Sequence, residues 1–588
     1  MSTAESKQVI FRSLDDLEET PEFRQFVARE FPEGVENPPD GVTRRRWIQL
    51  MGASAVLAGV SGCRFENKKI TPYAFRPEDR VPGDTREFAT TIEWAGAVRP
   101  MYVTSYDSRP IKVDGNPLHE ESGGSVPRGR QAQAVASKGT SDLVSQASVL
   151  DLYDPDRSRG CLEKVGREFE SRTWADFAAA VGSLDLAASG GEGFVVLSEP
   201  TTSKAVSALK DRFAAKYPRA RWFDYSPVNS DNEAAGLKAA FGKSVLPQFD
   251  LSSSEVVVCL DADPLGFHAS SLKNSKGWAA SRVPYSARVA HRPIGRYYSI
   301  ESQFTITGMN ADHRWPMKSS VIGSFAESLR LQVEKVREAG NPIDPVGSAE
   351  EQRVAILANE LVYGINDITP SSSGKCVVMV GANQPAEVHQ VAAVINELIG
   401  SKLVSYVSVP ESASNLGSIG EAVEVLDSGV VENLLLIGGN PLYDAPAELG
   451  FGSVLAKAKN KIHFSMAANE TTYQCDWHAN MAHPFEVWTD SVAYDGSHCV
   501  GQPMIDPLFD SKSTVELLAM LVGESKTGVE LVRGAFGDLA ETDWFEAVHD
   551  GFVKGSASGA TAVSQPVVPA GLDAAAWMAE DDSIEGGF

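Results

Sequence analysis

Four short, uninterrupted apolar runs constrain the fold of this chain more than any other feature of its sequence. They comprise residues 194–197, 256–260, 376–380 and 434–437. Runs that are apolar throughout are typical of strands buried on both faces of a parallel sheet. Segments with helical periodicity lie among them, at residues 201–217, 349–363 and 387–399. The alternation predicts an α/β fold with right-handed crossovers and helices on both faces of a mostly parallel sheet.

The same pattern predicts how the 588 residues divide into domains. We expect two doubly wound α/β lobes, at residues 165–365 and 366–530, separated by the polar stretch 370–374. A loop-rich β region at 64–164 precedes them and includes a hairpin whose turn lies at Asp107 and Ser108. Residues 531–588 are rich in Gly, Ala, Ser and acidic residues, which predicts a flexible C-terminal linker or tail.

The N-terminal part of the chain predicts where the protein works. Residues 1–43 form an acidic extension, and residues 44–63 follow it with the order of an export signal. Arg44 and Arg45 fit the paired arginines of a twin-arginine signal, and the apolar run that follows is shorter than the roughly 20 residues of a membrane span. Cys63 then fits a lipidation site. The alternative is an amphipathic helix with a basic start.

Charge excludes some partners. The formal net charge of −25 opposes binding to nucleic acid or to an anionic lipid surface, both of which require a basic footprint. It suits an acidic, exported protein.

The cysteine spacing argues against a local iron–sulfur cluster. Six cysteines are present, and no two are separated by the short spacings that hold such clusters. Cys259 and Cys376 lie in apolar runs, which predicts inert buried thiols. Cys475 and Cys499 could pair with each other or play no role.

Three loops after apolar runs are the candidate ligand site, because an open α/β sheet binds its ligand at the carboxyl ends of its strands. Backbone N–H groups of glycines can approach a phosphate, and Asn or Asp side chains can read a base or a ribose. Each loop taken singly is also an ordinary turn. The candidate residues are Asp261, Asp263, Gly381, Asn383, Gly438, Gly439 and Asn440.

One cluster of histidines has the composition of a metal site. His463, His478, His483 and His498 lie near Cys475, Asp476, Glu486 and Asp490. Their spacing matches no zinc signature, which favours hydrogen-bonded structural histidines. The sequence therefore predicts no metal ligand and no catalytic residue, and it contains no GxSxG nucleophile motif.

Nine segments together resemble a known family. They run collinearly from about residue 12 to about residue 525 and include LDADPLG, GANQPAEVH and LIGGNPLYDAP. The segments are residues 13–34, 44–46, 109–120, 148–158, 260–266, 301–316, 381–389, 436–446 and 469–490. The sequence resembles the molybdopterin-oxidoreductase-like half of the alternative complex III B subunit, in the TAT-variant-translocated molybdopterin oxidoreductase family.

The resemblance implies a structural subunit, without molybdenum cofactor, of a quinol-oxidising respiratory complex that passes electrons to a downstream acceptor. It implies partners that carry iron–sulfur clusters in a ferredoxin-like subunit or domain, haems in multihaem cytochromes, and a quinol site in an integral membrane subunit. It also implies a location at the periplasmic face of the inner membrane, with a lipid anchor at Cys63. The chain departs from the family pattern because it ends before a cysteine-rich ferredoxin-like half.

Two alternatives stay open at this point. One is a catalytic oxidoreductase with a molybdenum bis-pterin guanine dinucleotide, for which Cys161 is the only early cysteine that could serve as metal ligand. The other is an exported binding lipoprotein that uses the cleft between its lobes.

Overall fold

The computed structural model describes residue 21 and residues 84–579, without positions 95, 123–138, 185, 284–293, 366–373, 410–415 and 538. The chain forms two units, Met1–Arg80 and Val81–Phe588, and the description below concerns the second. The predictions for Arg44, Arg45 and Cys63 fall outside the described residues. Among the residues that are described, no helix is both long and apolar enough to cross a membrane.

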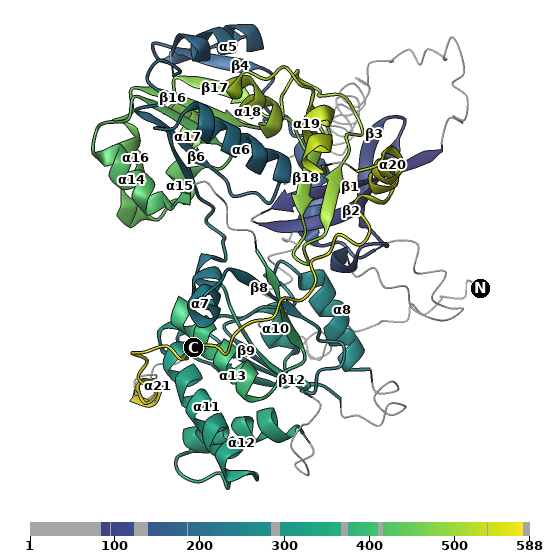
Figure 1. Ribbon diagram of the computed structural model, residues 1–588, viewed down its shortest axis with the longest axis vertical. Coiled ribbons are helices and arrows are strands. Elements are labelled where there is room, and N and C mark those ends of the chain that lie inside the picture. Colours follow the sequence, from purple (N-terminus) through teal and green to yellow (C-terminus); the bar gives the residue numbers. More distant parts are fainter. Residues whose placement is uncertain are drawn as a thin grey trace, which may run out of the picture. The chain divides into compact units, whose positions relative to one another are not determined.

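An eight-stranded sheet with helices on both faces forms the part that we call lobe A (Figure 1). Its strands, in spatial order, are β14 (Leu416–Gly417), β7 (Arg221–Asp224), β6 (Phe194–Ser198), β15 (Asn433–Ile437), β16 (Asn460–Ser465), β17 (Trp477–Asn480), β4 (Cys161–Val165) and β5 (Glu168–Arg172). The first six are parallel to their neighbours, and β4 joins antiparallel. The helices of this lobe are α5 (Trp174–Ser183), α6 (Lys204–Lys216), α14 (Ile419–Asp427), α15 (Pro441–Asp444), α16 (Phe451–Leu455), α17 (Glu470–Tyr473), α18 (Thr514–Val522), α19 (Gly528–Ala535) and α20 (Glu541–Asp550).

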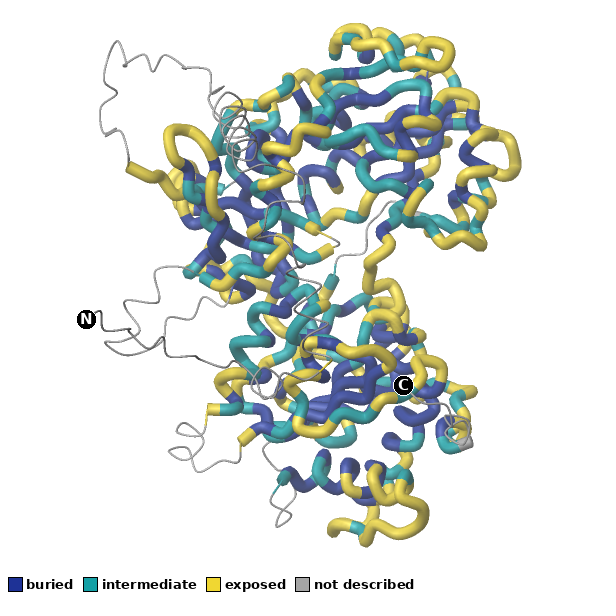
Figure 2. Tube along the Cα trace, turned by 180° about the vertical axis from the view of Figure 1, so that it is seen from behind, coloured by how far each residue is buried: buried dark blue, intermediate teal, exposed yellow. Residues whose placement is uncertain are grey.

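A four-stranded parallel sheet forms the centre of lobe B. Its order is β11 (His313–Pro316), β10 (Arg296–Glu301), β9 (Val256–Leu260) and β12 (Cys376–Val380). One face packs on α11 (Ser319–Ala339), α12 (Ala349–Tyr363) and α13 (Ala386–Leu398). Near it lie α7 (Asp231–Phe241), α8 (Ser271–Ser281) and a pair of strands, β8 (Val245–Phe249) and β13 (Val404–Ser408). Central strands of both lobes are buried (Figure 2).

The four apolar runs are parallel strands, as predicted, and the predicted α/β fold class is confirmed. The boundary predicted between residues 365 and 366 is wrong as a division between sheets. Phe194 of β6 pairs with Asn433 of β15, and Val256 of β9 pairs with Cys376 of β12, so each sheet takes strands from both predicted lobes. Local sequence order cannot reveal this, because consecutive strands often do not lie side by side in a sheet.

The predicted hairpin before the lobes is also confirmed. It joins β2 (Ala97–Tyr106) to β3 (Arg109–Gly115), and β1 (Thr85–Trp94) completes a three-stranded antiparallel sheet. Asp107 has φ 46° and Ser108 has φ 63°, the left-handed pair of a two-residue turn that matches strand twist. Helix α4 (Leu143–Leu152) packs against β3.

The C-terminal segment is packed, where a flexible linker was expected. The Thr561 N–H donates to the Tyr406 carbonyl at 2.7 Å, and the Val567 N–H donates to the Ala240 carbonyl at 2.9 Å. Trp577, on α21 (Ala576–Ala579), is buried against Phe325 of α11. The prediction of a flexible tail at residues 531–588 is therefore wrong for its described residues, because apolar residues such as Trp544 pack in lobe A and others such as Trp577 pack in lobe B, which composition alone does not show.

Trp577→Leu is expected to lower the free energy of unfolding by about 1–2 kcal/mol, since leucine refills only part of the volume and loses the edge contact with Phe325. Chemical denaturation of the two proteins measures this difference. An unchanged unfolding midpoint would show that the segment contributes nothing to lobe B.

Candidate functional site

The three predicted loops lie at the carboxyl ends of parallel strands, but in two different sheets. Asp261 and Asp263 follow β9, and Gly381 and Asn383 follow the neighbouring strand β12, so lobe B brings these two loops together. The loop with Gly438, Gly439 and Asn440 follows β15 in lobe A. Each lobe therefore has its own candidate ligand-binding loops, which we call the cradle of that lobe.

The Asp261 carboxylate is the centre of the cradle in lobe B. One oxygen accepts from the Ser302 N–H at 2.8 Å, and the other accepts from Asn383 Nδ2 at 3.0 Å, Gln384 Nε2 at 2.9 Å and Ser319 Oγ at 3.0 Å. Burial raises the pKa of Asp261, but the hydrogen bonds outweigh it and hold the pKa below its usual value. Two predicted site residues, the acid Asp261 and the amide Asn383, thus bind each other.

Asp263 and Gly381 also stabilise the loops that follow β9 and β12. Asp263 accepts from the Thr307 N–H at 2.9 Å and from Thr307 Oγ1 at 2.7 Å. A β-carbon built on Gly381 would lie 2.0 Å from the Asp261 carbonyl oxygen, so close backbone approach requires glycine there. These contacts hold the loops after β9 and β12 in place at the carboxyl ends of the strands.

In lobe A a carboxylate of the protein itself occupies the glycine cradle. Gly438 and Gly439 have φ of 71° and 64°, and Glu199, which follows β6, lies against them. The Gly439 N–H donates to the Glu199 carboxylate. Burial raises the pKa of Glu199, and its side chain occupies the position at which backbone N–H groups of this conformation favour an anion.

The third residue of that loop is also engaged. Asn440 Nδ2 donates to Glu470 Oε2 at 2.7 Å, and Asn440 Oδ1 accepts from the Thr471 N–H at 3.2 Å and from Thr471 Oγ1 at 2.7 Å. Both polar ends of the Asn440 amide are therefore used within lobe A.

Gly438→Ala is expected to lower the free energy of unfolding by about 1–3 kcal/mol. A β-carbon at this position would lie 2.1 Å from Glu199 Oε2, and φ of 71° strains any residue with a β-carbon. Gly429→Ala is the matched control, since φ there is 73° but no atom lies within 4 Å of a β-carbon. Denaturant unfolding measures both variants. If Gly438→Ala and Gly429→Ala lower the free energy of unfolding equally, the contact between Gly438 and Glu199 contributes nothing to stability.

Three of the four clustered histidines are buried and hydrogen-bonded, which confirms the prediction of structural histidines. His463 Nδ1 lies 2.7 Å from Thr472 Oγ1, and His478 Nε2 lies 2.7 Å from Ser158 Oγ. His483 Nε2 lies 3.0 Å from the carbonyl oxygen of Ser148. Within the described part of the chain, no group of three or more His, Cys, Asp or Glu side chains is placed to hold a metal ion.

The acidic neighbours of these histidines have structural partners. Asp490 accepts from Ser203 Oγ and from the backbone N–H groups of Lys204 and Ala205, where α6 begins. Glu486 forms a buried ion pair with Arg157.

The five described cysteines are all buried and none of them forms a disulfide, so Cys475 and Cys499 do not pair with each other. Cys259 and Cys376 are buried within strands, as predicted. Burial raises the pKa of the Cys161 thiol to about 11 and that of Cys475 to about 12. These thiols are inert parts of the packed interior.

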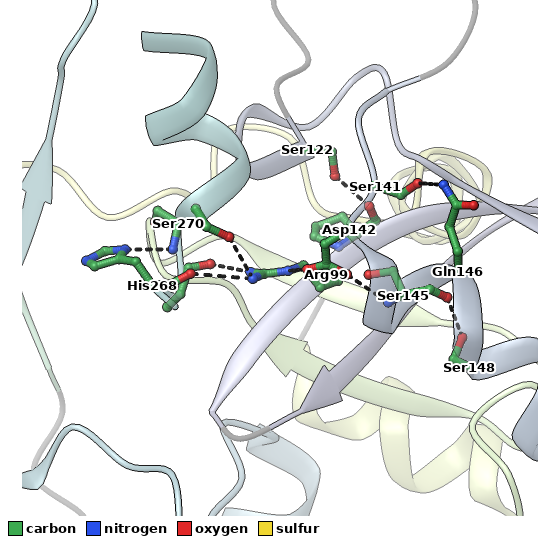
Figure 3. Close-up of polar contacts among 12 residues, drawn as sticks. Arg99, Ser122, Ser141, Asp142, Ser145, Gln146, Ser148, His268 and Ser270 are labelled. Carbon is green, nitrogen blue, oxygen red and sulfur yellow. Dashed lines mark hydrogen bonds and ion pairs between the residues drawn. The ribbon is translucent and has the colours of Figure 1, made fainter. Parts of the chain in front are cut away.

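Arg99 forms a junction that the sequence did not reveal (Figure 3). Its guanidinium donates to Asp142 Oδ2 at 2.6 Å, to Ser271 Oγ at 3.2 Å and to the Ala269 carbonyl. It thereby connects β2, the start of α4 and the loop that precedes α8. No motif surrounds Arg99 in the sequence, and only the tertiary structure assembles its acceptors.

Comparisons with known proteins agree with this architecture. No family model matches the chain. The chain is 22% identical over 502 residues to the menaquinone reductase, molybdopterin-binding-like subunit of Nitratidesulfovibrio vulgaris (strain Hildenborough), covering 79% of this chain and 68% of that one. Acetylene hydratase from Pelobacter acetylenicus has a similar fold, with a TM-score of 0.52 at 10% identity over 78% of this chain and 72% of the other.

Proposed function

Since this chain is a molybdopterin-oxidoreductase-like protein, we propose that it is a non-catalytic subunit of a quinol-linked respiratory complex. In this proposal it binds no molybdenum cofactor and supports electron transfer from quinol to a downstream acceptor, as the corresponding half of an alternative complex III B subunit does. The observation that carries the proposal is that both candidate cradles hold carboxylates of the protein itself, Glu199 in lobe A and Asp261 in lobe B.

Polar groups that the candidate loops could offer to a pterin dinucleotide are bonded within the protein. Its phosphates would meet the Glu199 side chain at the glycine turn, where Glu199 already accepts from the Gly439 N–H and burial raises the pKa of Glu199. Its polar ring edges would compete with the Asp261 carboxylate for Asn383 and Gln384. Cys161, the early cysteine considered as a metal ligand, has no exposed surface and lies in the core of lobe A. The residues present therefore do not fit the cofactor.

The proposed partners follow from the relative's name and from the resemblance. A menaquinone reductase subunit belongs to an assembly with further subunits. We propose partners with iron–sulfur clusters in a ferredoxin-like subunit or domain, multihaem cytochromes, and an integral membrane subunit that binds quinol. The twin-arginine signal with Arg44 and Arg45 and the lipidation site at Cys63 would place the chain at the periplasmic face of the inner membrane.

The test is an elemental and pterin analysis of the native complex, solubilised gently from membranes. We expect iron and haem in stoichiometric partners, and molybdenum and pterin well below one per chain. About one molybdenum and two pterins per chain would overturn the proposal and support the catalytic alternative. A chain that purifies alone, with neither partners nor cofactor, would support the alternative of an exported binding lipoprotein.

A further inference from the structure

The segment that follows α20 crosses from lobe A to lobe B. Helix α20 ends at Asp550 and packs in lobe A, whereas Trp577 is buried in lobe B against Phe325. We call residues 551–579 the strap. Figure 1 shows the strap, drawn in yellow, running from one lobe to the other. The chain also passes between the lobes after β7 and after β13, so the strap is a third covalent connection between them.

The first part of the strap is fixed to lobe A by backbone hydrogen bonds. It pairs antiparallel with β19 (His498–Gly501), where the Val553 N–H donates to the His498 carbonyl at 2.8 Å. At the turn that precedes β19, the Ser558 N–H donates to the Asp495 carbonyl at 2.9 Å. The strap is therefore attached to lobe A as far as residue 558.

The second part of the strap is fixed to lobe B. The hydrogen bonds of Thr561 and Val567 described above join it to β13 and α7. Gln390 Nε2 of α13 donates to the Val567 carbonyl at 2.6 Å, and the Trp577 N–H donates to Ser324 Oγ of α11 at 3.0 Å. The strap is thus attached to four elements of lobe B, beginning at residue 561.

Very little chain separates the two attached parts. Ser558 is bonded to lobe A and Thr561 to lobe B, so only Gly559 and Ala560 lie between them, and both are exposed. Three steps between consecutive Cα atoms span at most about 11 Å. The lobes cannot move apart at this place by more than that length unless one set of hydrogen bonds breaks.

The lobes do not share an apolar core. Within the described part of the chain, no buried apolar cluster contains residues of both lobes. A few contacts join them: Gln248 Nε2 of β8 donates to the Tyr494 carbonyl at 2.6 Å, and the Tyr494 ring meets His268 edge-on with the ring centroids 5.2 Å apart. Domains without a large apolar interface are expected to move relative to each other.

We propose that the strap is a latch that holds lobe A and lobe B at a fixed spacing, and that the lobes move relative to each other when the strap is given slack. A short tether that is attached at both ends keeps the two bodies that it joins at a high effective concentration. Subunits bound to different lobes would then keep a fixed distance from each other. That last consequence rests on the proposed function, whereas the latch itself rests only on the contacts of the strap.

A flexible insertion in the strap of the full chain tests the proposal. About 12 Gly and Ser residues, which span about 20 Å, are inserted between Gly559 and Ala560, so that both attached parts are kept. The control carries the same insertion between Gly166 and Arg167, an exposed turn that joins β4 to β5 within lobe A.

Pulsed electron paramagnetic resonance measures the spacing of the lobes. Spin labels are attached to ketone amino acids at Tyr443 in lobe A and Ile356 in lobe B, whose side chains are 77% and 44% exposed. We expect a narrow distance distribution in the parent and in the control. The insertion in the strap should make the distribution at least about twofold broader, because the lobes share no apolar core.

Three results would overturn the proposal. An unchanged distribution after the insertion would show that the other contacts hold the lobes without the strap. Equal broadening by the control insertion would show that the effect is not specific to the strap. A parent distribution as broad as that of the variant would show that the lobes move in spite of the strap. Molybdenum content decides the proposed function separately, because it does not depend on the spacing of the lobes.

Gly496→Ala adds a test without an insertion. A β-carbon at this position would lie 2.1 Å from Ser558 Oγ, and φ there is 86°, so the substitution should displace the strap from lobe A. Gly523→Ala is the matched control, since φ is 84° and the nearest atom, Lys216 Nζ, lies 3.4 Å away. We expect a broader distance distribution for Gly496→Ala than for Gly523→Ala. Equal distributions in the two variants would contradict the proposal.

Discussion

Replacing Arg157 with Met is expected to lower the free energy of unfolding by about 3–5 kcal/mol. The Arg157 guanidinium binds both oxygens of Glu486, at 3.0 and 2.6 Å, and also donates to the Leu152 carbonyl at 2.9 Å. The side chains of Arg157 and Glu486 are 3% and 0% exposed. Removal of the cation would leave the Glu486 carboxylate buried without its opposite charge, which costs more than an exposed ion pair contributes. Equilibrium denaturation in urea measures the loss.

Two further variants make this result specific. Arg219→Met breaks an ion pair with Glu192 whose side chains are 63% and 70% exposed, and we expect little change in stability. Arg157→Met combined with Glu486→Leu removes both buried charges, and we expect part of the lost stability to return. If the double variant is less stable than the wild type by the sum of the losses from Arg157→Met alone and Glu486→Leu alone, the two charges do not act as a pair.

The free energy of unfolding of the wild type is expected to fall more steeply with acid than that of His478→Gln. Burial, followed by the nearby His463, lowers the pKa of His478 to about 3. The unfolded histidine titrates near 6.5, so between about pH 6.5 and 3 the unfolded chain binds a proton that the folded chain excludes. This histidine therefore destabilises the fold by about 1.4 kcal/mol for each pH unit below about 6. Glutamine does not titrate and removes that slope.

The measurement is the difference in unfolding free energy between wild type and variant at pH 7.0, 6.0, 5.0 and 4.5. A constant difference across the series would mean that His478 takes up its proton in the folded state.

Much of the fold could be predicted from the sequence because its main signals are local. An uninterrupted apolar run such as 256–260 has few alternatives to a buried strand, and Asp107-Ser108 between two strands defines its own turn. The pairing of β6 with β15 could not be predicted, because the strands of lobe B lie between them in the sequence. No local signal indicates that the chain returns to lobe A and pairs there. For the same reason the contacts of the C-terminal segment could not be predicted, since its composition indicates only a flexible linker or tail.

The candidate site shows the same limit. The sequence correctly placed Asp261, Asn383 and Gly438 at the carboxyl ends of strands. It could not show that Asn383 donates to Asp261, or that Glu199 reaches the glycine turn from another strand. The sequence alone cannot distinguish a polar residue that binds a ligand at a strand end from one that is hydrogen-bonded within the protein. Only its hydrogen-bond partners in the structure distinguish the two cases.

The strand order of lobe A also dictates when that lobe can form as the chain is made. Phe194 of β6 has Arg221 of β7 close behind it in the sequence, but the neighbour on its other side, β15, begins only at Asn433. The sheet of lobe B is complete once β12 has been synthesised, before β15 exists. While lobe B folds, the nascent chain therefore exposes the edge of β6 that will later pair with β15. An unpaired strand edge is prone to aggregation, so this is the stage of synthesis at which a chaperone would protect the chain.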